Sequence, residues 1–129
     1  MKKIDNFLKA VIRLNEAIAV YNANQNNTVI RDGVIQRFEF TFELSWKAIK
    51  EYLIDQGMKK ELQFPKQVLK TAYESYVISD EKIWLEMVDA RNATSHIYDD
   101  NAAGKIAENI CSCFIIQLVA LSEYFKEHC

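Results

Sequence analysis

Apolar side chains recur every three or four residues along most of the chain, and this spacing predicts amphipathic helices. The first such segment runs from Ile4 to Tyr21 and is followed by a polar, asparagine-rich connection at residues 22–28. The last runs from about Asn101 to the end, with apolar positions at Ile106, Ile110, Phe114, Leu118, Leu121 and Phe125. Both segments would turn one apolar face toward a shared core.

The segment between Gly33 and Gly57 carries two patterns at once. Residues 38–46 alternate apolar and polar side chains as a strand would. A helical spacing nevertheless continues through both ends of that stretch, at Ile35, Phe38, Phe42, Trp46, Ile49 and Leu53. A strand of this length would exceed the usual range. We therefore predict one long helix that ends before Gly57, supported by an ion pair between Glu43 and Lys47.

The same helix would have a second apolar stripe. Phe40 and Leu44 fall about 200° from Phe38 on a helical projection. A helix that is apolar on two faces lies at the centre of a bundle or is covered by another chain.

Two shorter helices are predicted between the long ones. Pro65 suits the first position of one, with an inner face of Val68, Leu69, Ala72, Tyr73 and Tyr76. Ser79 suits the cap of the other, which would start at Asp80. Only 3 Gly and 1 Pro occur in 129 residues, too few for the many turns of a β-sandwich. The chain is predicted to be all-α, an antiparallel up-and-down four-helix bundle with one extra short helix, in a single domain spanning residues 1–129.

Charge and composition limit the ligands and the cellular location that we expect for this chain. Lys plus Arg is 16 and Asp plus Glu is 18, so the net charge is 16 − 18 = −2 and any attraction to RNA must be local. The chain starts with no signal peptide, and the apolar run 113–121 is too short to span a bilayer, so we expect a cytoplasmic protein with no membrane association. Cys111 and Cys113 would lie about 200° apart on a helix, which predicts free thiols and no metal site.

Polar residues break the pattern at the end of the fourth helix. On a helical projection, Arg91 and Tyr98 fall on the same face as the apolar Trp84 and Met87. A buried arginine without a partner would cost several kcal/mol. Arg91 therefore requires a partner carboxylate, a second subunit or a bound anion.

His96 follows Arg91 by five residues, which places the two about 140° apart on a straight helix. They could face one site only if the helix distorts near Thr94 and Ser95, or if a second copy supplies the other half. Asn92 lies four residues before His96 and could hold its ring by a hydrogen bond. On the residues alone, an ion-paired arginine, a surface imidazole and a core phenol remain the alternative interpretation.

The segment 91–98, Arg-Asn-Ala-Thr-Ser-His-Ile-Tyr, resembles the Arg-x4-His-x-Tyr motif of HEPN-domain proteins. Residues 37–47 are similar to the signature helix of one such family, the nucleotidyltransferase substrate-binding family. The resemblance covers nearly the whole chain. It implies a homodimer in which the two motif helices meet across a two-fold axis, and a minimal nucleotidyltransferase, encoded nearby, as partner.

The resemblance also implies roles for individual residues. Many members of the family are ribonuclease toxins that the transferase neutralises, in some cases by attaching AMP to the motif tyrosine, here Tyr98. His96 would transfer protons, Arg91 would stabilise the charged phosphate and Asn92 would orient the site. Because one histidine cannot easily act as both acid and base, two copies would complete the site.

Two functions follow. The chain is either a metal-independent endoribonuclease toxin of a toxin–antitoxin module or a non-catalytic substrate-binding subunit that docks to the transferase. No cofactor is expected in this chain, since ATP and Mg²⁺ would belong to the partner.

Overall fold

The computed structural model describes residues 1–96 and 99–129, and of His96 it describes the backbone only. These residues form helices and no strand, which confirms the all-α prediction. In chain order the elements are α1 (Lys2–Asn22), α2 (Thr28–Asp55), α3 (Pro65–Glu74), α4 (Glu81–Ala93), the 3₁₀ turn η1 (Thr94–His96), α5 (Asp100–Asn109), the π-helical turn η2 (Ile110–Phe114) and α6 (Ile115–His128).

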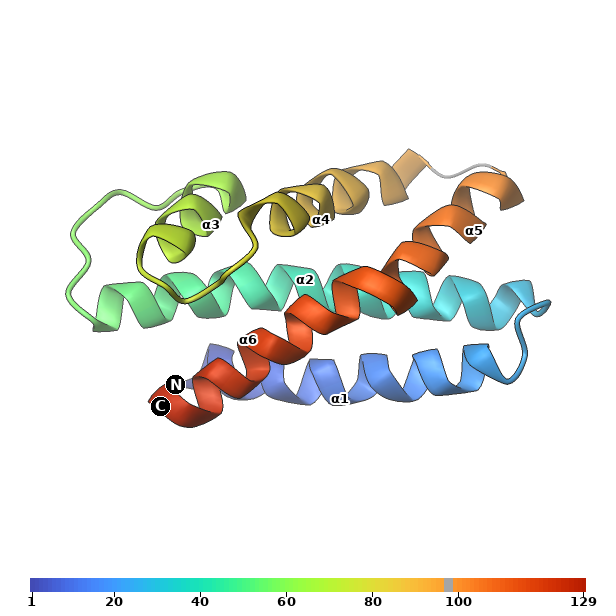
Figure 1. Ribbon diagram of the computed structural model, residues 1–129, viewed down its shortest axis with the longest axis horizontal. Helices are drawn as coiled ribbons and strands as arrows, with labels where there is room; N and C mark the ends of the chain where they lie inside the picture. Colours follow the sequence, from blue (N-terminus) through green and yellow to red (C-terminus); the bar gives the residue numbers. More distant parts are fainter. Residues whose placement is uncertain (97–98) are drawn as a thin grey trace.

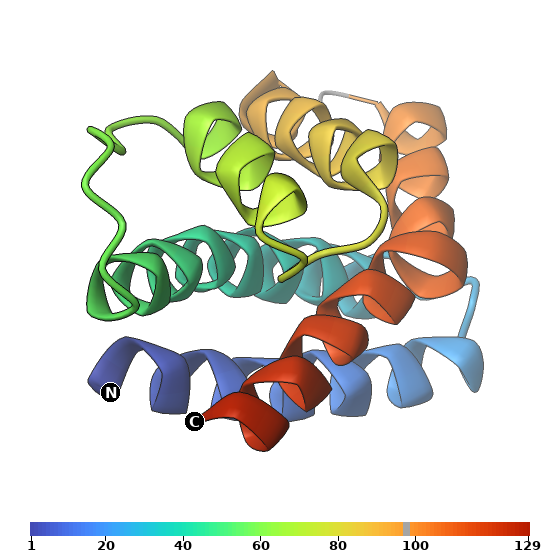
Figure 2. The ribbon, with the colours of Figure 1, turned by 60° about the vertical axis from the view of Figure 1, so that its left-hand side comes forward.

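The helices form an up-and-down bundle (Figures 1 and 2). Successive long elements α1, α2, α4 and the continuous helix α5–η2–α6 alternate in direction, and α3 is the short extra helix. α3 and α4 pack on the side of α2 that faces away from α1, and α6 returns obliquely toward the start of α1. The end of α4 therefore lies along the first half of α2, next to the start of α5.

Large side chains from α1, α2, α3, α4 and α6 fill the core, and the largest fully buried ones are Trp84, Phe7, Phe38, Phe42, Phe125, Leu14, Ile49, Leu69 and Met87. The rings of Phe42 and Trp84 lie 6.3 Å apart between centroids, and the ring of Phe38 stacks on that of Phe114 at 5.4 Å. These contacts fix α4 and η2 against the middle of α2. The position of the α4 C-terminus is thus set by the core.

The segment with two patterns is one helix of 28 residues, α2, as predicted. It ends as expected: Gly57 has a φ of +94°, its N–H donates to the carbonyl of Ile54, and that of Met58 donates to Leu53, both at 3.0 Å. On the second stripe Leu44 is half-buried, whereas the ring of Phe40 is 63% exposed. Within this chain the second stripe of α2 remains partly uncovered.

Two predictions for the shorter helices are wrong. Asp80, not Ser79, caps α4, because its Oδ1 accepts from the backbone N–H of Ile83 at 3.1 Å. Tyr73 and Tyr76 are exposed rather than buried. Tyr73 lies about 100° from Ala72, at the edge of the buried face of α3, and Tyr76 lies beyond the end of that helix with a φ of +64°.

The apolar run 113–121 belongs to the long last helix that the sequence predicts. By length and composition, the continuous helix Asp100–His128 could cross a membrane, with a window of mean hydropathy 1.4 of which 28% is buried. One such helix is weak evidence for a membrane span, since the core helix of a soluble protein has the same properties. Here Ile110, Phe114 and Leu118 lie in the core of the bundle.

Candidate functional site at the end of α4

Arg91 lies in the last turn of α4 and faces two carboxylates of α2. Its Nη1 is 3.8 Å from Oε2 of Glu39, and its Nε is 3.4 Å from Oε1 of Glu43. The Arg91 side chain is 31% exposed. Of the three partners predicted for this arginine, the structure provides a carboxylate, twice, from the same chain. The core contacts that hold α4 against α2 thereby also hold Arg91 in place.

The ion pair leaves part of the guanidinium without a hydrogen bond. The Nε atom of Arg91 is buried and makes no hydrogen bond within the described residues, because its 3.4 Å contact with Glu43 lacks the required geometry. The two carboxylates therefore balance the positive charge of Arg91, but they leave its Nε–H without a hydrogen bond. A planar guanidinium in this state keeps donors for an acceptor such as a phosphate oxygen.

The helix changes form directly after Arg91. The hydroxyl of Thr94 donates to the carbonyl of Arg91 at 2.7 Å, and that of Ser95 donates to the carbonyl of Asn92 at 3.2 Å. Side chains thus bond carbonyls at the helix end, and the chain continues as the 3₁₀ turn η1. The helix is therefore distorted near Thr94 and Ser95, which is the first of the two conditions under which Arg91 and His96 could face one site.

The distortion does not by itself bring Arg91 and position 96 together. A 3₁₀ helix advances about 120° per residue instead of about 100°. The tighter turn therefore increases the separation of about 140° expected on a straight helix. The distortion therefore does not provide the first of the two ways to unite Arg91 and His96, and the second remains a prediction.

Part of the predicted motif lies outside the described residues. The side chain of His96 and all of Tyr98 belong to this group. Asn92 is described and exposed, but its predicted hydrogen bond to His96 remains a prediction. The comparison of Arg91 and Tyr98 on one helical face also remains untested.

A groove of about 440 Å³ opens on one side of Arg91. Phe40 forms its apolar part, and Arg13, Arg37, Glu39 and Glu43 contribute charges of both signs. The guanidinium of Arg37 donates to the backbone carbonyl of Arg13 at 2.8 Å and so joins α2 to α1. We call this surface the Phe40 groove. It combines an exposed aromatic ring with a mixed pattern of charges.

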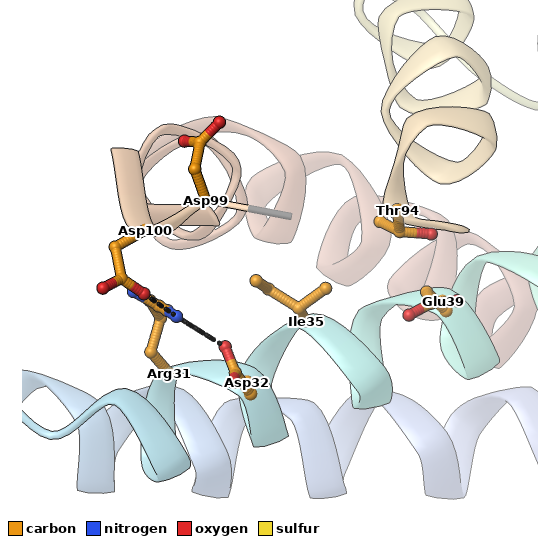
Figure 3. Close-up of a pocket in the computed structure, with 7 residues that line it drawn as sticks. All are labelled: Arg31, Asp32, Ile35, Glu39, Thr94, Asp99 and Asp100. Carbon is orange, nitrogen blue, oxygen red and sulfur yellow. Dashed lines mark hydrogen bonds and ion pairs between the residues drawn. The ribbon is translucent and has the colours of Figure 1, made fainter. Parts of the chain in front are cut away.

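A second groove, of about 340 Å³, lies next to Thr94 and the start of α5 (Figure 3). We call it the Arg31 groove; it is lined by Arg31, Asp32, Ile35, Glu39, Thr94, Asp99 and Asp100. Arg31 is the single cation among four carboxylates in this lining. Glu39 is the one residue that lines both grooves. Asp99 and Asp100 at the start of α5 thus add to the acidic character of the Arg31 groove.

Arg31 itself is buried, with 8% of the residue exposed. Its Nε donates to Oδ1 of Asp32 at 3.0 Å, and its Nη2 donates to Oδ1 of Asp100 at 3.1 Å. Burial alone would lower the pKa of Arg31, but the hydrogen bonds to the two aspartates outweigh it and raise that pKa above its ordinary value. The side chain is therefore charged at every relevant pH.

Sequence reasoning missed Glu39 as well as Arg31 and misassigned Glu43. Glu43 was predicted to pair with Lys47, but it faces Arg91 and accepts a hydrogen bond from the indole of Trp46 at 3.3 Å. Lys47 lies over the Trp46 ring instead, 5.9 Å from its centroid. Two acids four residues apart on one helix repel each other unless a cation lies between them. That spacing was the signal that could have identified Glu39 and Glu43 as partners of Arg91.

The cysteines are free among the described residues, as the sequence suggested. Burial raises the pKa of the Cys111 thiol, which keeps it protonated and makes it a poor nucleophile. The residues that the structure describes contain no group of three or more His, Cys, Asp or Glu side chains arranged to hold a metal ion.

The described residues define an all-helical up-and-down bundle with an ion-paired arginine in the last turn of the fourth helix. The family described as nucleotidyltransferase substrate binding protein like matches residues 2–127, and the chain belongs to this family.

Similar proteins agree with this assignment. A Haemophilus influenzae protein named probable ribonuclease HepT is 33% identical over 98 residues, which cover 74% of this chain and 66%, just under two thirds, of that protein. A solved structure from Haemophilus influenzae, reported to reveal the fold of a substrate binding domain of a nucleotidyltransferase, has a TM-score of 0.82 at 27% identity and covers 95% of this chain and 98% of its own. A crystal structure from Thermus thermophilus has a TM-score of 0.74 at 32% identity, with 93% and 95% of the two chains covered.

Proposed function

We propose that this chain is the HEPN-type component of a two-gene nucleotidyltransferase toxin–antitoxin module and acts as a metal-independent endoribonuclease that the partner nucleotidyltransferase neutralises. The observation that carries the proposal is the position of Arg91. It is held at a helix end by Glu39 and Glu43, directly before the turn that leads to His96. The likeness to a protein named probable ribonuclease HepT supports the same function.

The residue types fit cleavage of RNA by its own 2′-hydroxyl. A base must take the 2′-OH proton, an acid must protonate the leaving 5′ oxygen, and a cation must stabilise the charge on phosphorus. His96 from each of two copies would act as base and acid. Arg91 would bind the phosphate through its free donors, and Asn92 would orient the imidazole. ATP and Mg²⁺ belong to the partner, and the setting is cytoplasmic.

A homodimer is part of this proposal, and the Phe40 groove is the face that fits it. The ring of Phe40 is 63% exposed and is surrounded by arginines and glutamates. A two-fold interface brings one surface against itself, so a face with both signs of charge around an apolar centre is self-complementary. Pairing through this face would place the two copies of Arg91 near each other.

We therefore expect the wild-type chain to scatter light at micromolar concentration as a particle of about twice 15.0 kDa. Phe40→Glu should give about half that mass and lose nuclease activity, because it places charges at the centre of the interface. Phe64→Glu is the matched control, since Phe64 is 61% exposed on another part of the bundle. A fully active monomeric wild type would rule out the shared site.

A second function is favoured by one specific observation. Arg91 already has two carboxylates of its own chain beside it, so a docked phosphate must compete with them. That arrangement suits a non-catalytic subunit which presents substrate to the transferase.

Expression in bacteria distinguishes the two functions. We expect the chain alone to arrest growth and the co-expressed transferase to relieve the arrest, because an unmodified nuclease would degrade cellular RNA. Arg91→Ala should be harmless in both settings and serves as the control for expression burden. Harmless expression of the wild-type chain alone, at a protein level equal to that of the variant, would favour the substrate-binding subunit.

A further inference from the structure

The outer side of α3 carries lysines and a tyrosine. On a helical projection Lys66, Lys70 and Tyr73 fall within about 60° of one another, and all three are exposed. Val68, on the opposite side of the helix, is buried in the core. Phe64 falls about 200° from Lys66 and is not part of this surface. Lys66 and Tyr73 are seven residues apart in sequence, so the surface is about 10 Å long.

The segment around this helix is basic, although the chain as a whole is not. Residues 58–76 contain four lysines and two glutamates, whereas the whole chain has a net charge of −2. Lys60 pairs with Glu74 at 3.8 Å. Lys66 pairs with Asp89 at 4.0 Å. All four side chains are more than half exposed, so water screens both pairs and leaves the ammonium groups available to a phosphate.

Tyr76 occupies a position at which glycine is usual. It follows Ser75, the C-cap of α3, and has a φ of +64°. Its N–H donates to the carbonyl of Tyr73 at 3.2 Å, and that of Val77 donates to the carbonyl of Ala72 at 2.9 Å, which is the Schellman arrangement. A residue with a Cβ is disfavoured in this conformation, and Tyr76 is 89% exposed. Neither backbone conformation nor burial therefore accounts for a tyrosine here.

Tyr73 and Tyr76 both line a groove of about 430 Å³. Glu74, Ser79 and the buried Ile78 complete its lining. Exposed aromatic rings stack on nucleic-acid bases without requiring a particular sequence, because every base has a π-face. Proteins reach bases in this way in single strands, where the bases can leave the stack. The tyrosines thus match unpaired bases, as the lysines match phosphates.

This surface begins next to the end of α4. The two helices α3 and α4 lie side by side (Figure 2), and Lys66 pairs with Asp89, two residues before Arg91. From Lys66 the other lysine and the tyrosines follow in order along α3, away from this point. A single strand bound on α3 would therefore lead toward the turn of α4 that carries Arg91.

We propose that this surface binds single-stranded RNA outside the candidate site. We call it the α3 face and define it by Lys66, Lys70, Tyr73 and Tyr76. The ammonium groups bind phosphates, and the rings stack on unpaired bases. The identity of the ligand as RNA rests on the proposed function, whereas the face consists of described residues only.

The first test removes the lysines. Binding is measured by fluorescence anisotropy with a short labelled oligouridine that has 2′-O-methyl sugars, so that its own 2′-hydroxyls cannot cleave it. The double variant Lys66→Ala/Lys70→Ala should bind more weakly, and its dependence of log K on log salt should be less steep by about 1.4, because each phosphate contact contributes about 0.7. Lys2→Ala/Lys9→Ala is the matched control. It removes the same charge from exposed positions of α1, on the other side of α2, and should keep the wild-type slope.

The second test separates stacking from a structural role of Tyr76. Tyr76→Ala should weaken binding of the same probe by about 5- to 100-fold, and Tyr76→Phe, which keeps the ring, should restore most of the affinity. Tyr76→Gly supplies the residue that the backbone favours. It should melt at a temperature no lower than that of the wild type and still bind as weakly as Tyr76→Ala. A purely structural tyrosine would give a glycine variant with wild-type affinity.

Several results would overturn the inference. They are a wild-type chain that does not bind the probe, and wild-type affinity in either the double lysine variant or Tyr76→Ala. If these variants lose binding to the transferase and keep their affinity for RNA, the face docks a protein instead. Because the probe is not cleaved, the nuclease is tested separately: a wild-type chain that binds the probe but does not arrest growth contradicts the proposed ribonuclease and supports the α3 face.

Discussion

Replacing His96 by Ala should lower RNA cleavage by about 10²–10⁴-fold, the usual contribution of a general acid or base. Arg91→Ala should lower it by about 10²–10³-fold, as for the loss of one group that stabilises transition-state charge. Both variants should keep their helical content and their dimeric state. The measurement is the initial rate on a fluorescent RNA oligonucleotide, with growth arrest as a second readout.

The chain supplies its own control, because it has only 2 histidines. His128 is exposed at the end of α6 and bonds the carbonyl of Tyr124 through its ring at 2.8 Å, so His128→Ala should cleave at the wild-type rate. EDTA should leave the activity unchanged if the mechanism is metal-independent. Full activity of either the His96→Ala or the Arg91→Ala variant would refute the assigned site, and loss of activity in EDTA would refute the metal-independent mechanism.

In cells that also express the transferase, we expect the Tyr98→Phe variant to arrest growth and the wild-type chain not to. The variant keeps the ring and loses only the hydroxyl that would receive AMP, so its nuclease activity should persist while the co-expressed transferase no longer neutralises it. Mass spectrometry of the wild-type protein should show added whole AMP units on the peptide that contains Tyr98. Tyr76→Phe is the control, because Tyr76 is 89% exposed and lies outside the motif.

One result would exclude neutralisation by AMP transfer. If the wild-type chain stays unmodified and is still fully inhibited in the complex, the partner acts by covering the site. The structure adds one constraint to the modification mechanism. An AMP phosphate that reached Arg91 would have to displace or join Glu39 and Glu43, which already neutralise it.

Local patterns in the sequence were sufficient for the fold. Helical spacing on both sides of residues 38–46 outweighed the alternation within that stretch, because Phe38 and Phe42 reach one core while Phe40 stays outside it. The wrong predictions concern residues near helix ends, where the exact end of the helix decides whether a side chain is buried. Tyr76 fits the spacing of α3, yet the helix ends at Glu74 and the chain turns away.

The candidate site could be predicted only as far as single helices allow. The position of Arg91 on its helix and its need for a partner, with a carboxylate as one of three alternatives, were evident from spacing. The partners of Arg91 lie on α2, two helices earlier in the chain, and Arg31 meets Asp100 across 69 residues. Such pairings depend on how helices pack against one another, which hydrophobic periodicity does not specify.

The position of Glu39 in the lining of both grooves has a consequence for binding in either of them. The carboxylate of Glu39 cannot at the same time pair with Arg91 and point into the Arg31 groove. An occupant of either groove that reorients Glu39 therefore changes the charge presented by the other. By thermodynamic reciprocity, if binding in the Phe40 groove weakens or strengthens binding in the Arg31 groove by some factor, the reverse effect has the same size. Binding in the two grooves would then be coupled through the single side chain that they share, without any change in the fold.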